Sequence, residues 1–268
     1  MDLMLKDRVI LVTAASRGLG YATARTLCAE GAHVVLCSRS QQSIEEAAAR
    51  IREDPDVVQS GAAVVPVAAD VTDRADIETL RDTALERFGR IDGLYINAGG
   101  PPPGEFLDLT PEDWEAATQL TLQSAVELAY AVVPTMRAGG GGSLLANTSI
   151  TVRHPLDNLI LSNSVRMAVV GLIKSLSIEL GPDGIRANAI APGWTRTERV
   201  DQLLRSRADK AGTTPEGEAD RIAAEIPLRR MADPTEYARV AAFLLSPAAS
   251  YITGVTLLVD GGMARAVL

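Results

Sequence analysis

The segment VILVTAASRGLG, residues 9–20, runs from an apolar stretch directly into a turn that contains two glycines. Its first four residues predict a buried strand, and the pattern after Gly20 predicts a helix that follows at once. Glycines at such a junction let the backbone approach a pyrophosphate, and the helix N-terminus offers free N–H groups and a favourable dipole. An ordinary tight turn can also contain two glycines. Phosphate binding is favoured here because this turn lies at the first strand-to-helix junction. The candidate cofactor-binding residues of this turn are Thr13, Ser16, Arg17, Gly18 and Leu19.

The rest of the chain alternates short apolar runs with longer helical stretches. The expected strands are 9–12, 34–37, 64–67, 94–96, 144–146, 187–190 and 256–259. The expected helices are 20–30, 43–52, 75–88, 111–136, 163–180 and 234–245. This alternation predicts an α/β, Rossmann-type doubly wound fold, with a seven-stranded parallel sheet, helices on both faces and right-handed crossovers.

Several predicted helices carry signals at their ends. Thr110 and Asp113 flank a proline at a predicted helix start, as in a capping box, and Asp233 and Glu236 repeat the arrangement. Glycines that follow predicted helices indicate C-terminal caps. These glycines are Gly31, Gly89 and Gly181.

No long linker and no repeat divides the chain, so we expect one domain over residues 1–268. Residues 196–226 are polar and charged, with a break in helical pattern at 211–217. Once the fold is accepted, this segment is expected to be a lid over a binding site. The alternative is a variable surface excursion.

Composition excludes some classes of protein. Hydrophobic residues make up 47% of the 268, enough for a substantial core, whereas the net charge of −8 and a pI of about 4.9 argue against nucleic-acid binding. Two cysteines make a disulfide framework implausible and favour a reducing cytoplasm. No segment reaches the roughly 20 apolar residues that cross a bilayer, so no membrane association is expected. No metal site is predicted.

The end of the second predicted strand indicates which dinucleotide binds. A carboxylate there would bind the adenosine ribose and repel a 2′-phosphate, but the chain has Ser38 and Arg39, with Arg17 available from the glycine turn. Guanidinium groups suit a phosphate, so NADP(H) is favoured over NAD(H). Alternatively, both arginines are solvated surface charges.

The sequence resembles the short-chain dehydrogenase/reductase family over roughly residues 5–262. Within that family, 3-oxoacyl-acyl-carrier-protein reductases are the nearest general comparison. The resemblance is collective and lies in the order and spacing of several motifs. They are the turn at 13–20, Asp70-Val71, Asn97-Ala98-Gly99-Gly100, Ser149, and the segments 184–188, 192–197, 251–254 and 259–262.

The resemblance implies roles for cofactor-binding positions. Asp70 and Val71 would contact the adenine. Asn97, Ala98 and Gly99 would line the cofactor groove. The residues implied near the nicotinamide are Pro192, Gly193, Thr195 and Thr197. Each of these residue types also favours turns for local reasons, so their joint placement after predicted strands is what supports the assignment.

The chain departs from the family pattern at several positions. The first glycine of the cofactor turn is Ala14, whose Cβ can strain a tight turn. The family's Tyr-x-x-x-Lys pair aligns with Ser162 and Arg166. Ser149, thirteen residues before Ser162, matches the family's serine, and Thr121 falls where an asparagine is expected. The tyrosines Tyr130, Tyr237 and Tyr251 have no motif support.

These departures matter because carbonyl reduction needs a proton on oxygen. A serine hydroxyl is a far weaker acid than a phenol beside an ammonium, and arginine stays protonated, so loss of the general acid costs about 10²–10⁴-fold in rate. Arg166 can still bind cofactor ribose hydroxyls or an anionic substrate group. His154, in a segment that by resemblance borders the cleft, is a candidate proton donor. A surface-loop histidine is the alternative.

Three functions therefore remain open. The first is an NADP(H)-linked oxidoreductase that acts on a ketone or secondary alcohol with a non-standard proton donor. The second is a non-catalytic dinucleotide- or metabolite-binding protein, and the third is a redox-neutral lyase or isomerase. Each would act on a small molecule, and the resemblance implies a homodimer or homotetramer, with the apolar tail 264–268 compatible with burial at an interface.

Overall fold

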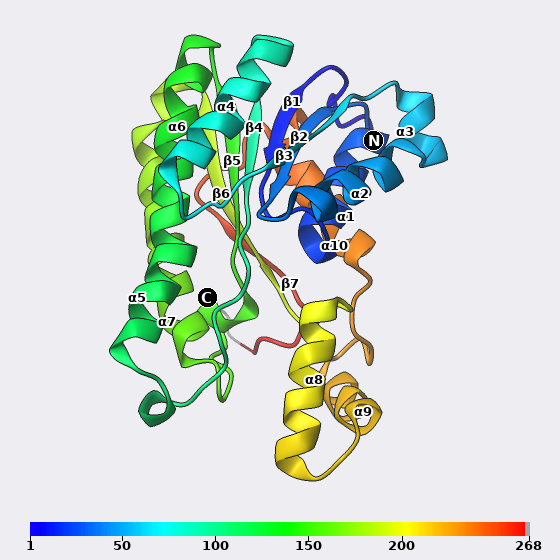
Figure 1. Cartoon of the computed structure of the whole chain (residues 1–268), viewed down its shortest axis with the longest axis vertical. Helices are drawn as coiled ribbons and strands as arrows, with labels where there is room; N and C mark the ends of the chain where they lie inside the picture. Colours follow the sequence, from blue (N-terminus) through cyan, green and yellow to red (C-terminus); the bar gives the residue numbers. More distant parts are fainter. Residues whose placement is uncertain (266–268) are drawn as a thin grey trace.

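The centre of the computed structural model is a seven-stranded parallel sheet in the order β3-β2-β1-β4-β5-β6-β7 (Figure 1). The structure describes residues 1–265. The strands are β1 (Val9–Val12), β2 (His33–Ser38), β3 (Val64–Ala68), β4 (Gly93–Ile96), β5 (Gly142–Asn147), β6 (Ile185–Pro192) and β7 (Thr256–Val259). The predicted fold class is confirmed. Strand order reverses on the two sides of β1, and open α/β sheets bind ligands at the carboxyl ends of strands beside such a point.

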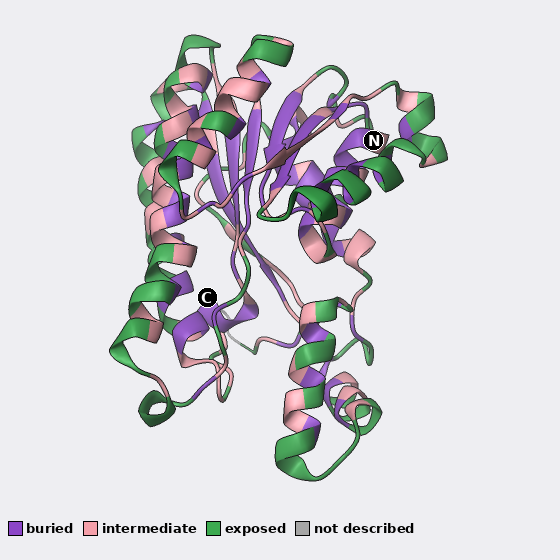
Figure 2. Cartoon of the chain, viewed as in Figure 1, coloured by how far each residue is buried: buried purple, intermediate pink, exposed green. Residues whose placement is uncertain are grey.

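Helices cover both faces of the sheet (Figure 1). The helices of the described chain are α1 (Gly18–Ala29), α2 (Gln41–Arg52), α3 (Pro55–Ser60), α4 (Arg74–Phe88), α5 (Pro111–Thr118), α6 (Ser124–Ala138), α7 (Ile160–Glu179), α8 (Glu198–Ala211), α9 (Pro215–Glu225) and α10 (Pro234–Leu245). Side chains of β1 alternate between two cores, because successive residues of a strand point to opposite faces. Val9 and Leu11 pack with α4, α6 and α7, whereas Ile10 and Val12 pack with α1, α2 and α10. Figure 2 shows these strands buried between the two helical layers.

Helix ends follow the sequence signals with one exception. Both capping boxes, Thr110 with Asp113 and Asp233 with Glu236, form as predicted. Gly89 ends α4 in the left-handed conformation. The prediction for Gly181 is wrong. Because Pro182 suits the first position of a helical turn, the chain makes a 3₁₀ turn at Gly181–Asp183, and Gly184 with φ of 72° takes the left-handed position instead.

The expected helix at 111–136 is interrupted. A π-helical turn, η2 (Gln119–Gln123), separates α5 from α6. Such π turns widen a helix locally and often occur at functional sites. Short α3 was not expected, although Asp54 caps it and Pro55 opens it.

Helices α8 and α9 extend beyond the carboxyl edge of the sheet (Figure 1). Gly212 ends α8 in the left-handed conformation and Thr214 caps α9, so the predicted break at 211–217 is confirmed. The two helices share a small core with the loop after β6. That core contains Trp194, Val200, Leu204, Ile222 and Ile226. Within residues 1–265, no helix combines the length and apolar character that a membrane crossing requires.

Candidate functional site

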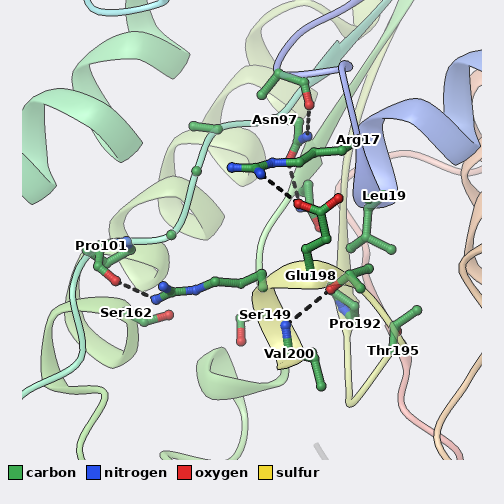
Figure 3. A pocket seen from close by; sticks show the side chains of 18 of the residues that line it. Arg17, Leu19, Asn97, Pro101, Ser149, Ser162, Pro192, Thr195, Glu198 and Val200 are labelled. Carbon is green, nitrogen blue, oxygen red and sulfur yellow. Dashed lines mark hydrogen bonds and ion pairs between the residues drawn. The ribbon is translucent and has the colours of Figure 1, made fainter. Parts of the chain in front are cut away.

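A cavity of about 530 Å³ lies along the carboxyl edge of the sheet (Figure 3). The ends of six strands, β1 to β6, and the loops that follow them line it, together with the first turns of α8 and part of α7. The predicted residues that line it are Ser16, Arg17, Gly18, Leu19, Ser38, Arg39, Asp70, Val71, Asn97, Ala98, Gly99, Ser149, Ser162, Arg166, Pro192, Gly193, Thr195 and Thr197. The structure thus brings nearly all predicted site residues to one crevice.

The glycine turn forms a backbone cradle at the start of α1. Gly18 begins the helix with φ of 58°, and no side chain caps its N-terminus. A Cβ on Gly20 would lie 2.4 Å from the Ala14 carbonyl oxygen and 2.9 Å from Asn97 Nδ2, so only glycine fits. Ala14 itself has φ of 49°, the left-handed conformation that a glycine would adopt without strain. The open helix end, with no acidic residue in its first turn, suits an anionic group.

Thr13 holds this turn from behind. Its side chain is wholly buried and does not line the cavity, unlike the other predicted residues of the turn. The Thr13 hydroxyl donates to the Asn97 carbonyl oxygen at 2.6 Å and accepts from the Asn97 N–H at 2.8 Å. Asn97 Nδ2 donates in turn to the carbonyl oxygens of Thr13 and Ala14. Thr13 and Asn97 therefore fix the turn after β1 against the loop after β4.

The end of the crevice beside β2 and β3 contains Ser38, Arg39, Asp70 and Val71. Asp70 is held in place, since its Oδ1 accepts hydrogen bonds from the N–H and the hydroxyl of Thr72. No carboxylate within residues 1–265 forms an ion pair with Arg39.

The sequence predicts that Arg17 and Arg39 bind one anion together. In the structure, Arg17 instead pairs with a carboxylate of the protein. Its Nη1 lies 2.6 Å from Glu198 Oε2, and both side chains are exposed (Figure 3). This pair bridges the glycine turn and the first residue of α8. Arg39 is therefore the guanidinium at this end that is left without a protein carboxylate.

The other end of the crevice holds Ser149 and Ser162. Ser149 Oγ accepts from the Thr151 N–H at 3.2 Å, and Ser162 Oγ lies 3.3 Å from Thr151 Oγ1. Ser162 and Arg166 share the inward face of α7 at helical spacing. Ser149, Ser162 and Arg166 all line the cavity.

Thr121 and His154 are not among the residues that line the cavity. Thr121 lies buried in the π turn η2, where its hydroxyl has no partner within the described residues, and the neighbouring Leu120 lines the cavity instead. His154 lies on the loop after the 3₁₀ turn Ile150–Val152 and is partly exposed. The structure does not bring this imidazole to the crevice.

Arg166 is a buried cation, with 8% of its surface exposed. Its Nη1 donates to the carbonyl oxygens of Asn147 and Thr148 at 3.1 and 3.0 Å, while Nε has no partner within the described residues. Burial, and to a smaller extent the positive charge of Arg199, lowers the pKa of the Arg166 guanidinium to about 10. The group remains charged at neutral pH.

A chain of buried hydrogen bonds connects this region with the glycine turn. The Tyr95 hydroxyl lies 2.9 Å from that of Tyr237, which donates to Asn147 Oδ1 at 2.8 Å. Asn147 Nδ2 donates to Asn97 Oδ1, also at 2.8 Å. Burial raises the pKa of both phenols, so they stay protonated. No sequence motif pointed to Tyr237. The available signal was its place on an apolar helix face, where a buried tyrosine hydroxyl needs a hydrogen-bond partner.

The loop after β6 and the first turn of α8 contribute residues that the sequence did not single out. Trp194, Glu198, Arg199 and Val200 join the predicted threonines in lining the cavity. Thr195 Oγ1 and Trp194 Nε1 are buried without a hydrogen-bond partner within residues 1–265. Buried polar groups normally have partners, so these two are suited to a bound ligand.

The chemistry of the lining is unusual in one respect. Among the described residues that line the cavity, none is tyrosine, lysine, histidine or cysteine. The side-chain donors of the lining are therefore hydroxyls, amides, the Trp194 indole N–H and four guanidinium groups.

Comparison with known proteins finds a family model and relatives that match nearly the whole chain. Residues 13–264 match the family model described as Enoyl-(Acyl carrier protein) reductase. Dehydrogenase/reductase SDR family member 4 of Sus scrofa is 35% identical over 261 residues, covering 97% of this chain and 88% of that protein. Oxidoreductase UcpA of Escherichia coli K12 is 34% identical over 261 residues, covering 96% and 95%.

Two solved structures extend the comparison. The L-sorbose reductase of Gluconobacter frateurii, complexed with NADPH and L-sorbose, superposes with a TM-score of 0.92 at 32% identity and full coverage of both chains. Levodione reductase superposes with a TM-score of 0.89 at 32% identity, covering 97% of this chain and 99% of that one.

Proposed function

The chain belongs to the short-chain dehydrogenase/reductase family, and we propose that it is an NADP(H)-linked oxidoreductase acting on a ketone or secondary alcohol, without the family's tyrosine as proton donor. The observation that carries the proposal is one continuous cavity, which joins the glycine turn and Arg39 to Ser149, Ser162 and Arg166. The preference for NADP(H) is supported by Arg39, whose guanidinium suits a 2′-phosphate.

The residues present fit a dinucleotide. Amides at Gly18 and Leu19 would hold the pyrophosphate, and Ser38 with Arg39 would hold the adenosine phosphate. Thr195 Oγ1, buried without a partner, would bind the carboxamide of the nicotinamide. When bound, such a cofactor would supply the hydride that the carbonyl carbon receives.

The chain's own residues must then stabilise and protonate the oxygen. The hydroxyls of Ser149 and Ser162 can donate hydrogen bonds to it, and the Arg166 charge stabilises the alkoxide electrostatically. No lining group has the acidity of a phenol held beside an ammonium, so we propose that water in the cavity delivers the proton through Ser162. This chemistry predicts slow turnover.

A serine substitution tests the assignment. In the Ser162→Ala variant we expect kcat for carbonyl reduction to fall by about tenfold or more, because a donor to the developing oxyanion is lost. The dissociation constant for NADPH should stay within about twofold. The matched control is Ser164→Ala, an exposed serine on the same helix. Equal kcat in both variants and wild type would contradict the role of Ser162.

A second candidate function is dinucleotide binding without turnover. The absence of tyrosine, lysine and histidine among the described lining residues favours it. NADPH that binds tightly but is not oxidised with any member of a broad carbonyl panel would support this function. Substrate conversion without a change in nicotinamide absorbance would instead indicate a redox-neutral enzyme.

We further propose that the whole chain is one domain and that residues 196–226 form a lid. The lid is supported by Thr197 and the first turns of α8, which line the cavity, and by the Arg17–Glu198 ion pair.

We also propose a homodimer or homotetramer, supported by exposed Tyr130 and Ile178 on the outer helices. Of the apolar tail at 264–268, residues 266–268 lie outside the described part of the chain.

A further inference from the structure

The end of the cavity at Ser149 and Ser162 has an unbalanced positive charge. Within residues 1–265, the charged residues that line the cavity are Arg17, Arg39, Arg166, Arg199, Asp70 and Glu198. Glu198 is paired with Arg17, and Asp70 is bonded to Thr72 near Arg39. Within the described part of the chain, Arg166 and Arg199 are thus left without a carboxylate, although the net charge of the protein is −8.

Arg166 presents a free edge of its guanidinium. Nη1 donates to two backbone carbonyl oxygens, whereas neither Nε nor Nη2 donates a hydrogen bond to any of the described residues. Nε and Nη2 form one of the two edges with which arginine binds a carboxylate bidentately. Burial of a charge without a counter-ion is unfavourable, so a buried arginine of this kind favours an anion supplied by a ligand.

Arg199 reaches the same space from the first turn of α8. It is half-buried, and its Nη2 donates to the Pro101 carbonyl oxygen at 2.8 Å. Gly100 allows this position, because a Cβ there would lie 3.3 Å from Arg199 Nε. The charge of Arg199 contributes to the lowered pKa of Arg166, so the two guanidinium groups interact across the cavity. An anion between them would remove this repulsion.

We infer that the substrate is an oxo acid or hydroxy acid whose carboxylate lies between Arg166 and Arg199, with its carbonyl or alcohol oxygen at Ser149 and Ser162. This inference rests on the proposed function and narrows its substrate class. Proximity of the two serines to Arg166 places the carboxylate within a few bonds of the reacting carbon. A phosphate of the cofactor is the competing anion.

Binding tests the inference independently of turnover. The probes are oxamate and 3-hydroxybutyrate, each compared with its neutral amide, titrated calorimetrically into the protein loaded with NADP⁺ and into the protein alone. Charge-assisted bidentate bonds predict that each carboxylate binds at least about tenfold more tightly than its amide. Equal affinity of acid and amide in both series would overturn the inference.

Two substitutions locate the anion. Arg199→Gln is expected to remove the preference for the carboxylate over the amide, and Arg166→Lys to reduce it while retaining the charge. The matched control is Arg205→Gln, which removes an exposed charge from the same helix, away from the cavity. If Arg199→Gln weakens NADPH binding and leaves the preference for the carboxylate intact, these arginines serve the cofactor and the inference is wrong.

Turnover measurements distinguish the proposed reductase function from the proposed anion site. With 2-oxo and 3-oxo acids and their methyl esters as substrates, we expect kcat/KM to favour the acids by about ten- to a hundredfold. Reduction of esters and acids at equal rates would leave the reductase in place and overturn only the anion site. Carboxylate binding without oxidation of NADPH would contradict the proposed function while supporting the anion site.

Discussion

Ala14 occupies a backbone conformation that an L-amino acid adopts only at a cost. Its φ of 49° falls in the left-handed region, and its carbonyl oxygen accepts from Asn97 Nδ2, which fixes the turn. A non-glycine residue there costs about 1 kcal/mol or more, partly offset because glycine loses more conformational freedom on folding. The turn therefore keeps the shape of a phosphate cradle despite the missing glycine.

This strain gives a direct prediction. Ala14→Gly should raise the free energy of unfolding by about 0.5–1 kcal/mol, measured by urea denaturation, because the left-handed strain is relieved. NADPH affinity should be unchanged or improved. A variant that is less stable than wild type by a similar amount would show that Ala14 is not strained.

Arg39 decides between the two nicotinamide dinucleotides in the proposed site. Arg39→Asp should weaken NADPH binding by about tenfold or more, since it exchanges a favourable partner of the 2′-phosphate for a repulsive one, and should leave NADH binding equal or stronger. Titration of both nucleotides by fluorescence measures the ratio. An unchanged ratio would contradict the assignment of this end of the cavity.

At this scale, the family resemblance was the guide to Ser149, Ser162 and Arg166, which align with the family's serine, tyrosine and lysine positions. The structure places all three residues in the lining of one cavity. Arg199 and Asn147 were missed because their places depend on how α8 and β5 pack against other loops. No local pattern encodes such contacts.

Among the elements, β4 is attached to β1 through one carboxylate that precedes it. Asp92 accepts hydrogen bonds from the Val9 N–H and from the side chains of Arg8 and Arg90. Burial opposes ionisation of Asp92, but these bonds outweigh it and lower the pKa of its carboxyl. Ionised Asp92 thus stabilises the pairing at the centre of the sheet.

The lowered pKa gives a pH-dependent prediction. Because the folded-state pKa lies below the unfolded value of about 3.9, the contribution of Asp92 is complete above that pH and disappears as pH falls through the folded-state pKa. Asp92→Asn should destabilise the protein by about 1–3 kcal/mol at pH 7, and by progressively less below about pH 4. Urea denaturation at several pH values tests this, with the exposed Asp157→Asn as control. A difference independent of pH would contradict the account.

The helices show why element boundaries are harder to predict than element types. The pattern over 111–136 predicts one continuous helix, yet the π turn η2 interrupts it between α5 and α6. Helices α8 and α9 have polar sequences and owe their stability to a small core shared with Trp194. The capped starts at Thr110 and Asp233 were predictable because side-chain caps are local.

For the whole molecule, the alternation of strands and helices was enough to predict a seven-stranded parallel sheet, and the structure confirms it. The reversal of strand order at β1 then places the loops after β1, β4 and β5 around one crevice. Sequence could not predict the charge balance of that crevice, because Glu198 neutralises Arg17 only through the position of α8.

The central claim is that this crevice is a site for NADP(H), and a crystal structure of the protein soaked with NADP⁺ tests it most directly. We predict electron density for the adenosine phosphate at Ser38 and Arg39, for the pyrophosphate at Gly18 and Leu19, and for the nicotinamide beside Thr195, facing Ser149. A crevice that remains empty at saturating nucleotide, or that holds the nucleotide elsewhere, would contradict the account.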